Sequence, residues 1–327
     1  MHLTRRRTMA GIGGGLILLR SQTVLAQAAY PNRTIKMIVP NPAGGTTDLL
    51  GRLVADQLKT GLGASVIVEN KPGGGTTLGA EQVSRAAPDG YTLLMATSTT
   101  LAINKTLYKK LPYDPVRDFA AVALVAAVPF ALIVNPALPA KTLPEFIAYA
   151  KATPGLAYGS AGNGSPHHLG AEMLKSAAAI DIRHVPYRGS VSAMLDVIAG
   201  HIPFMVVDLQ PALQQIREGK VRVLGVTTLR RVAAAPDIPT LTESGLPGFE
   251  LVAWQGVAAP AGTPRAIIDQ LAGQIGLLLA DPGTRDKLTM MALEPLPGST
   301  PDSFAAFITT ELDRWATIVK HSGAEPE

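Results

Sequence analysis

Two glycine-rich segments contain the residues best suited to bind an anion. Residues 41–48 read Asn-Pro-Ala-Gly-Gly-Thr-Thr-Asp, and residues 160–168 read Ser-Ala-Gly-Asn-Gly-Ser-Pro-His-His. Each segment lies between a strand-like pattern and a helix-like pattern. Glycine lets backbone N–H groups approach a ligand closely, and the start of the next helix offers unpaired N–H groups at the positive end of its dipole. We therefore expect two anion-binding loops that hold one ligand from opposite sides.

Short apolar runs and amphipathic helical patterns alternate along the chain and position these loops. This alternation predicts an α/β protein with parallel sheets, whose ligands bind at the carboxyl ends of the strands. Both loops lie at such ends. The predicted strands are residues 35–39, 65–69, 92–96, 130–134, 156–159, 182–185, 204–207 and 221–226, and helical patterns include 48–59, 143–151, 168–178, 191–199 and 211–218.

The order of these patterns predicts two lobes. A first boundary is expected at residues 126–129, and a second cluster of strands and helices extends to about residue 227. Residues 236–248 are dense in proline and glycine, which break periodic structure. We expect the helices that follow, at 264–280, 282–291 and 301–321, to pack back on the first lobe. The chain would then cross between lobes twice, as in a hinged binding protein.

The N-terminal segment has the composition of a secretory signal peptide. Arg5, Arg6 and Arg7 precede a glycine-rich apolar stretch, and Ala26-Gln27-Ala28 matches a cleavage site. The paired arginines favour the twin-arginine route, with an ordinary Sec signal as the alternative. The four arginines of residues 1–28 account for the whole net charge of +4, so the mature chain is neutral. Bulk charge therefore gives no support for nucleic-acid binding.

Several kinds of chemistry are excluded by residues that the sequence lacks. The chain has no cysteine, which rules out disulfides, thiolate nucleophiles and cysteine-based zinc sites. Glycines at 73–75 are not followed by the Lys-Ser or Lys-Thr of a phosphate-binding loop, and no dinucleotide-binding glycine motif follows a strand. We expect no metal and no cofactor.

Motifs distributed over nearly the whole mature chain carry a family resemblance. They include Val-Glu-Asn-Lys-Pro-Gly-Gly-Gly at 68–75, Ala-Pro-Asp-Gly-Tyr-Thr-Leu-Leu at 87–94, His-Val-Pro-Tyr-Arg-Gly at 184–189, Pro-Asp-Ile-Pro-Thr at 236–240 and Trp-Gln-Gly at 254–256, besides the two loops. In this order and spacing, the chain resembles the periplasmic solute-binding proteins of tripartite tricarboxylate transporters, the Bug receptors.

The resemblance implies a fold, a function and a location. The fold is the two-lobe periplasmic-binding-protein (Venus flytrap, type II) fold with two hinge crossovers. Residues 1–28 form a cleaved signal peptide, residues 29–128 with 251–327 form lobe 1, and residues 129–250 form lobe 2. The function is a non-enzymatic periplasmic receptor, expected to be a monomer, that captures a small carboxylate and delivers it to inner-membrane permease subunits.

In this family, backbone amides of the two loops hold the ligand carboxylate, and a loop after Thr97 lines the same site. The residues themselves add Tyr187 as a pocket wall, Ser190 as a donor and Asp208 at a strand end. The predicted ligand-binding residues are Asn41, Pro42, Ala43, Gly44, Gly45, Thr46, Thr47, Ser98, Thr99, Ser160, Ala161, Gly162, Asn163, Gly164, Ser165, His168, Tyr187, Ser190 and Asp208.

Some of these residues have a second interpretation. Asp208 either receives a ligand ammonium or hydroxyl group or caps the helix that follows, and His168 either contacts ligand or has a structural role. Asp48 is expected to be a first-turn acid that supports its helix. Relatives usually have an aromatic residue where this chain has Asn41, a short amide with room and hydrogen-bonding groups for a different ligand.

Two other functions compete with that of a transport receptor. A hydrolase would use Ser165 with His168 or His184, although the sequence lacks the G-x-S-x-G motif of a nucleophile elbow. A sensor would have the same ligand-binding lobes and would signal to a membrane partner instead of a permease. The sequence of this chain does not distinguish a sensor from a transport receptor.

Overall fold

The structure is a computed structural model that describes residues 30–322 together with His2 and Ala324. Except for His2, the predicted signal peptide lies outside these residues. Among the described residues, no helix combines the length and the apolar character needed to cross a membrane.

The first glycine loop lies at the carboxyl end of a parallel three-stranded arrangement. Strand β1 (Ile35–Val39) lies between β2 (Val66–Asn70) and β3 (Thr92–Thr97), and all three run in the same direction. Helix α1 (Thr46–Leu62) follows β1, and α2 (Thr77–Ser84) precedes β3. The first three predicted strands are confirmed to within one residue at each end, whereas α2 was not predicted.

The second glycine loop lies in an equivalent position in the other part of the sheet. Strand β5 (Leu156–Ser160) lies between β6 (Ile182–Pro186) and β7 (Phe204–Asp208), again all parallel. Helix α5 (Pro166–Ala178) follows β5, and α6 (Ser190–Ala199) follows β6. This part also contains α4 (Leu143–Ala152), α7 (Leu209–Arg217) and β8 (Arg222–Val226).

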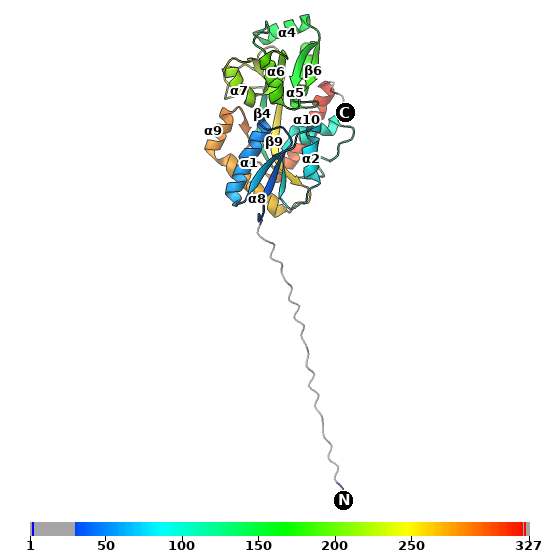
Figure 1. Ribbon diagram of the computed structural model, residues 1–327, viewed down its shortest axis with the longest axis vertical. Coiled ribbons are helices and arrows are strands. Elements are labelled where there is room, and N and C mark those ends of the chain that lie inside the picture. The colour runs from blue at the N-terminus through cyan, green and yellow to red at the C-terminus, as the bar shows by residue number, and fades with distance from the viewer. Residues whose placement is uncertain (1, 3–29, 323, 325–327) are drawn as a thin grey trace. The chain divides into compact units, whose positions relative to one another are not determined.

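One long strand, β4 (Phe119–Val134), joins these parts and connects the two lobes (Figure 1). It pairs antiparallel with β9 (Val252–Pro260) as far as Pro129 and then, from Phe130, with β7. The prediction of purely parallel sheets is wrong here, because segments that cross between lobes in opposite directions lie side by side. The sequence predicted only residues 130–134 of β4. The division into residues 29–128 with 251–327 and residues 129–250 stays a prediction, which this change of partner supports.

The C-terminal segment contains α8 (Arg265–Ala280), α9 (Pro282–Met290), β10 (Glu294–Pro295) and α10 (Pro301–Ser322). Helix α8 packs on α1 and β4, and α10 packs on β4. Helix α10 also contacts α5, so the expectation that this segment packs on the first lobe alone is too narrow.

The segment after Thr97 is helical, although the sequence predicted a loop. A short π-helical segment, Thr99–Ile103, leads directly into α3 (Asn104–Leu107). All five residues of the π-helical segment are buried, and α10 packs against them. This packing stabilises a helical conformation that the Ser-Thr-Thr sequence does not favour locally.

Candidate ligand-binding site

Helix α1 begins at the first glycine loop without a side-chain cap. Gly44 has φ +88°, a left-handed conformation that suits glycine, and Gly45 occupies the N-cap position with no side-chain hydrogen bond to the helix. Thr46 and Thr47, the first two helical residues, are buried. First-turn N–H groups have no acceptor within their own helix. An anion at this end would therefore meet unpaired donors and the positive end of the helix dipole.

Asp48 lies in the first turn of α1, as predicted, and it also holds the loop before the helix. Its Oδ2 accepts hydrogen bonds from the N–H of Gly44 at 3.1 Å and from Arg52 Nε at 3.0 Å, and its Oδ1 accepts one from Asn70 Nδ2 at 3.0 Å. Burial opposes ionisation of Asp48, but the bonds from Arg52, Gly44 and Asn70 hold its pKa below the ordinary value. The amide of Gly44, predicted to contact ligand, is already engaged by Asp48.

The second loop differs from the first because its helix is capped. Ser165 is the N-cap of α5 and accepts a hydrogen bond from the N–H of His168, and Pro166 fills the next position. The Ser165 hydroxyl donates to the carbonyl of Gly162 at 2.6 Å. The N–H of Gly164 donates to His168 Nδ1 at 3.1 Å. Much of the donor capacity predicted for a ligand is therefore used inside this loop.

Two stacked histidines support the second loop. The rings of His168 and His184 lie 4.0 Å apart and within 11° of parallel. His184 Nε2 is 2.6 Å from Ser160 Oγ, which also accepts a hydrogen bond from the N–H of Gly162. Burial and the neighbouring His168 lower the pKa of His184 to about 3. The bond from Gly164 to His168 supports the structural interpretation of His168, and its contact with a ligand stays a prediction.

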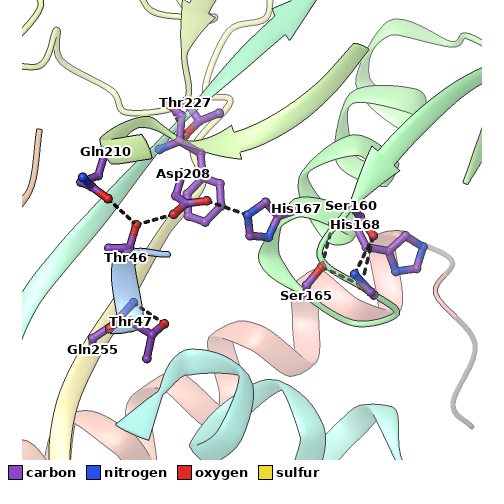
Figure 2. A network of polar contacts seen from close by, with 12 residues as sticks. Thr46, Thr47, Ser160, Ser165, His167, His168, Asp208, Gln210, Thr227 and Gln255 are labelled. Carbon is purple, nitrogen blue, oxygen red and sulfur yellow. Dashed lines mark hydrogen bonds and ion pairs between the residues drawn. The ribbon is translucent and has the colours of Figure 1, made fainter. Parts of the chain in front are cut away.

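Asp208 is the centre of a buried polar network between the lobes (Figure 2). Its carboxylate accepts hydrogen bonds from His167 Nε2 at 2.9 Å, from the hydroxyl of Thr46 and from Ser190. Burial opposes ionisation of Asp208, but these three donors hold its pKa below the ordinary value. Asp208 occupies the N-cap position of α7, but its side chain makes no capping bond, so the predicted side-chain cap is not formed.

The two lobes also lie close together at two other places. At Gly189, which precedes α6, an added Cβ would lie 3.1 Å from Pro42 Cγ. At Gly164, an added Cβ would collide with the side chain of Leu107 from α3. The lobes are therefore closed on one another in this structure.

Three residues of the network were not predicted from the sequence. His167 binds Asp208, Gln210 Oε1 lies 3.4 Å from the hydroxyl of Thr46, and Gln255 Nε2 donates to Thr47 Oγ1 at 3.0 Å. Gln255 belongs to β9 and is buried. The Trp-Gln-Gly motif at residues 254–256 was a signal for Gln255, whereas nothing local distinguishes His167 from the neighbouring histidine.

For the other predicted ligand-binding residues, the structure gives less direct evidence of a place in the site. Ser98 and Thr99 are buried where β3 passes into the π-helical segment. The hydroxyl of Tyr187 donates to Asp196 at 2.6 Å, and burial together with this carboxylate raises the pKa of Tyr187 to about 12. Its ring packs against the core of the second lobe. The remaining predicted residues, Asn41, Ala43, Ala161 and Asn163, lie within the two glycine loops.

The residues of the hydrolase alternative do not lie in a catalytic arrangement. The hydroxyl of Ser165 donates to the carbonyl of Gly162, and His168 Nδ1 accepts from Gly164, so neither group activates the other. His184 bonds Ser160 instead of Ser165. The described residues also contain no cluster of histidine and acidic side chains suited to a metal ion.

A family model described as "Tripartite tricarboxylate transporter family receptor" matches residues 50–324. The match begins just after the first glycine loop and includes the second loop and the network residues of β7 and β9. It therefore covers most of the chain.

Solved structures share both the fold and about a third of the sequence. Rpa4515 of R. palustris, solved with adipate, has a TM-score of 0.88 and 33% identity, covering 91% of this chain and 100% of that one. The periplasmic binding protein BugD has a TM-score of 0.86 and 35% identity, covering 91% and 100%. MatC (Rpa3494) from Rhodopseudomonas palustris, solved with bound malate, has a TM-score of 0.84 and 33% identity, covering 89% and 100%.

Proposed function

Because the chain belongs to the tripartite tricarboxylate transporter receptor family, we propose that it is a periplasmic receptor that binds one small carboxylate between its lobes and delivers it to an inner-membrane permease. Two relatives of similar fold have been solved with adipate and with malate, both small dicarboxylates. These relatives support a small carboxylate as the class of ligand. Which carboxylate this chain binds depends on its own residues.

The uncapped start of α1 carries this proposal. The N–H groups of Gly45, Thr46 and Thr47 would hold the ligand carboxylate, because no side chain caps this helix. The second loop would line the other side, with fewer free donors because Ser165 caps α5. Closure would exclude water and strengthen these hydrogen bonds.

The proposal is tested by giving α1 a cap of its own. In Gly45→Asp, the new carboxylate would bond the same first-turn amides that the ligand needs. Gly45 has an extended backbone and open space around an added Cβ, so the substitution fits the fold. Gly45→Ala is the matched control, because it adds a Cβ without an acceptor. The aspartate cap should make the fold more stable than the alanine variant by about 1 kcal/mol.

Binding is measured by thermal shift and calorimetry with di- and tricarboxylates, monocarboxylates, amino acids and aromatic acids. A carboxylate at about 100 times its Kd should stabilise wild type by about 2.7 kcal/mol. Gly45→Ala should keep most of this effect and Gly45→Asp should lose it. Wild type that responds to no carboxylate would contradict the proposed function, and equal binding by both variants would contradict the placement of the carboxylate on α1.

A further inference from the structure

Buried polar atoms without hydrogen-bond partners gather around the start of α1. Among the described residues these atoms include Asn41 Oδ1, Gln255 Oε1 and His167 Nδ1. Asn41 lies in the loop before α1, and Gln255 is bonded to Thr47. His167 reaches Thr46 through their shared partner Asp208 (Figure 2). Gln255 is therefore one hydrogen bond away from the first turn of α1, and His167 is two hydrogen bonds away.

Two of these atoms, Gln255 Oε1 and Asn41 Oδ1, are amide oxygens and therefore hydrogen-bond acceptors. Gln255 uses its Nε2 to donate to Thr47, which leaves the carbonyl end of the amide without a partner. A carboxylate accepts only, so His167 must donate from Nε2 to Asp208. An unpaired buried acceptor costs about 1–3 kcal/mol, so the two amide oxygens need donors.

The ligand carboxylate does not supply those donors, because it is itself an acceptor. Asp208 adds a further negative charge at the same place, and its pKa is lowered by its own donors. A carboxylate on the α1 amides would therefore lie beside acceptors that it cannot satisfy. A second group on the ligand has to carry polar hydrogens.

We propose that the ligand carries a hydroxyl or ammonium group on the carbon next to its carboxylate, and that this group donates to Gln255. The inference rests on the proposed function and specifies the ligand class for the same site. Thr46 and Thr47 are consecutive residues whose amides would face the carboxylate, while their side chains contact Asp208 and Gln255. The donor must therefore be close to the carboxylate, on the adjacent carbon.

The test uses acids that differ only at that carbon. Calorimetry compares succinate, L-malate and L-aspartate, then glutarate, L-2-hydroxyglutarate and L-glutamate, then propionate, L-lactate and L-alanine. In at least one series, the hydroxy or amino acid should bind wild type about tenfold more tightly than its unsubstituted parent, or about 1.4 kcal/mol. The stronger of the two identifies the donor as hydroxyl or ammonium.

A variant locates the effect at Gln255. Gln255→Met removes the amide with little change in volume, and Gln274→Met is the control, since Gln274 bonds Gln57 instead of the network. Gln255→Met should reduce the preference for the substituted acid to about twofold while parent acids bind as before, and Gln274→Met should change neither. Acids that bind without any preference would overturn this inference and leave the proposed function intact. Absence of binding by all of these acids would count against both, and an equal loss for parent and substituted acids in Gln255→Met would overturn the role of Gln255.

Discussion

The hydroxyl of Thr46 donates a hydrogen bond to the carboxylate of Asp208, which lies 162 residues further along the chain. Thr46 is the first residue of α1 and Asp208 is the last residue of β7, so this bond connects the two lobes. The same α1 turn supplies the amides proposed to hold the ligand. Closure of the lobes and binding of the carboxylate are therefore expected to depend on the same few residues.

Thr46→Val should destabilise the closed protein. Valine has nearly the same shape as threonine but removes one donor from the buried Asp208 carboxylate, a change that costs about 1–3 kcal/mol. The free energy of unfolding in urea measures this loss. Thr309→Val is the control, because Thr309 lies on the exposed face of α10 and bonds only its own helix. Equal stability of the two variants would show that the bond to Asp208 is not formed in solution.

Gly164→Ala should weaken ligand binding about tenfold by obstructing closure, a loss of about 1.4 kcal/mol. Gly164 and Gly155 have similar backbone conformations, with φ +66° and φ +74°. Alanine at either site should cost about 1–2 kcal/mol of stability, because L-residues disfavour this conformation. Only at Gly164 does the new Cβ meet Leu107 from the other lobe, whereas Gly155 has open space.

Calorimetry on both variants therefore separates obstructed closure from backbone strain. The double variant Gly164→Ala with Leu107→Ala should recover much of the affinity. If Gly155→Ala weakens binding as much as Gly164→Ala, strain and not the contact with Leu107 is responsible.

Stability should fall as pH falls from about 6.5 towards 3, the ordinary and the lowered pKa of His184. In this window the unfolded chain binds a proton at His184 and the folded chain does not, so protons favour unfolding. Above the window the contribution of His184 to stability is fully present. Urea unfolding across the window measures the slope.

In His184→Gln this slope should be shallower. His321→Gln is the control, because His321 is exposed near the end of α10 and bonds a carbonyl of its own helix. A slope that is unchanged in His184→Gln would mean that other groups cause the pH dependence.

Glu311→Leu should destabilise the protein by about 3 kcal/mol or more. The indole N–H groups of Trp254 and Trp315 both donate to Glu311 Oε2, at 2.8 and 2.7 Å, and Arg314 pairs with the same carboxylate. Leucine would leave all of these donors without an acceptor, whereas Glu311→Gln would keep one acceptor and cost less. The exposed Asp313 on the same helix provides the control, and Asp313→Asn should change stability by less than about 0.5 kcal/mol.

Tryptophan emission during urea unfolding is a direct measurement, because these are the two tryptophans of the chain. A change for Glu311→Leu no larger than that for Asp313→Asn would contradict the prediction.

The parts of the fold that could be predicted are those in which the local pattern and the tertiary packing agree. Strand β1 was predicted with its observed bounds, because an apolar run ends at Pro40 and a glycine loop. The first eleven residues of β4 were missed because Pro129 suggested a boundary. In the structure Pro129 forms the last pair with β9, where the strand changes partner.

The candidate site was predicted unevenly for a similar reason. Glycine loops before helices are visible in the sequence, so Gly44 and Gly45 could be identified. Serine followed by proline is also a recognisable helix start, and the cap formed by Ser165 reduces the number of free amides at α5. The roles of His167 and Gln255 depend on contacts with residues far away in the sequence, which no local pattern contains.

The continuous strand β4 determines how this molecule can move. Its pairing with β9 ends at Pro129 and its pairing with β7 begins at Phe130, so a bend between these two residues leaves both hydrogen-bond ladders intact. The change of partner is therefore the point in β4 where the angle between the lobes can change at the least cost in hydrogen bonds. Because the strand is continuous through this point, the lobes remain joined by one extended segment as the angle changes.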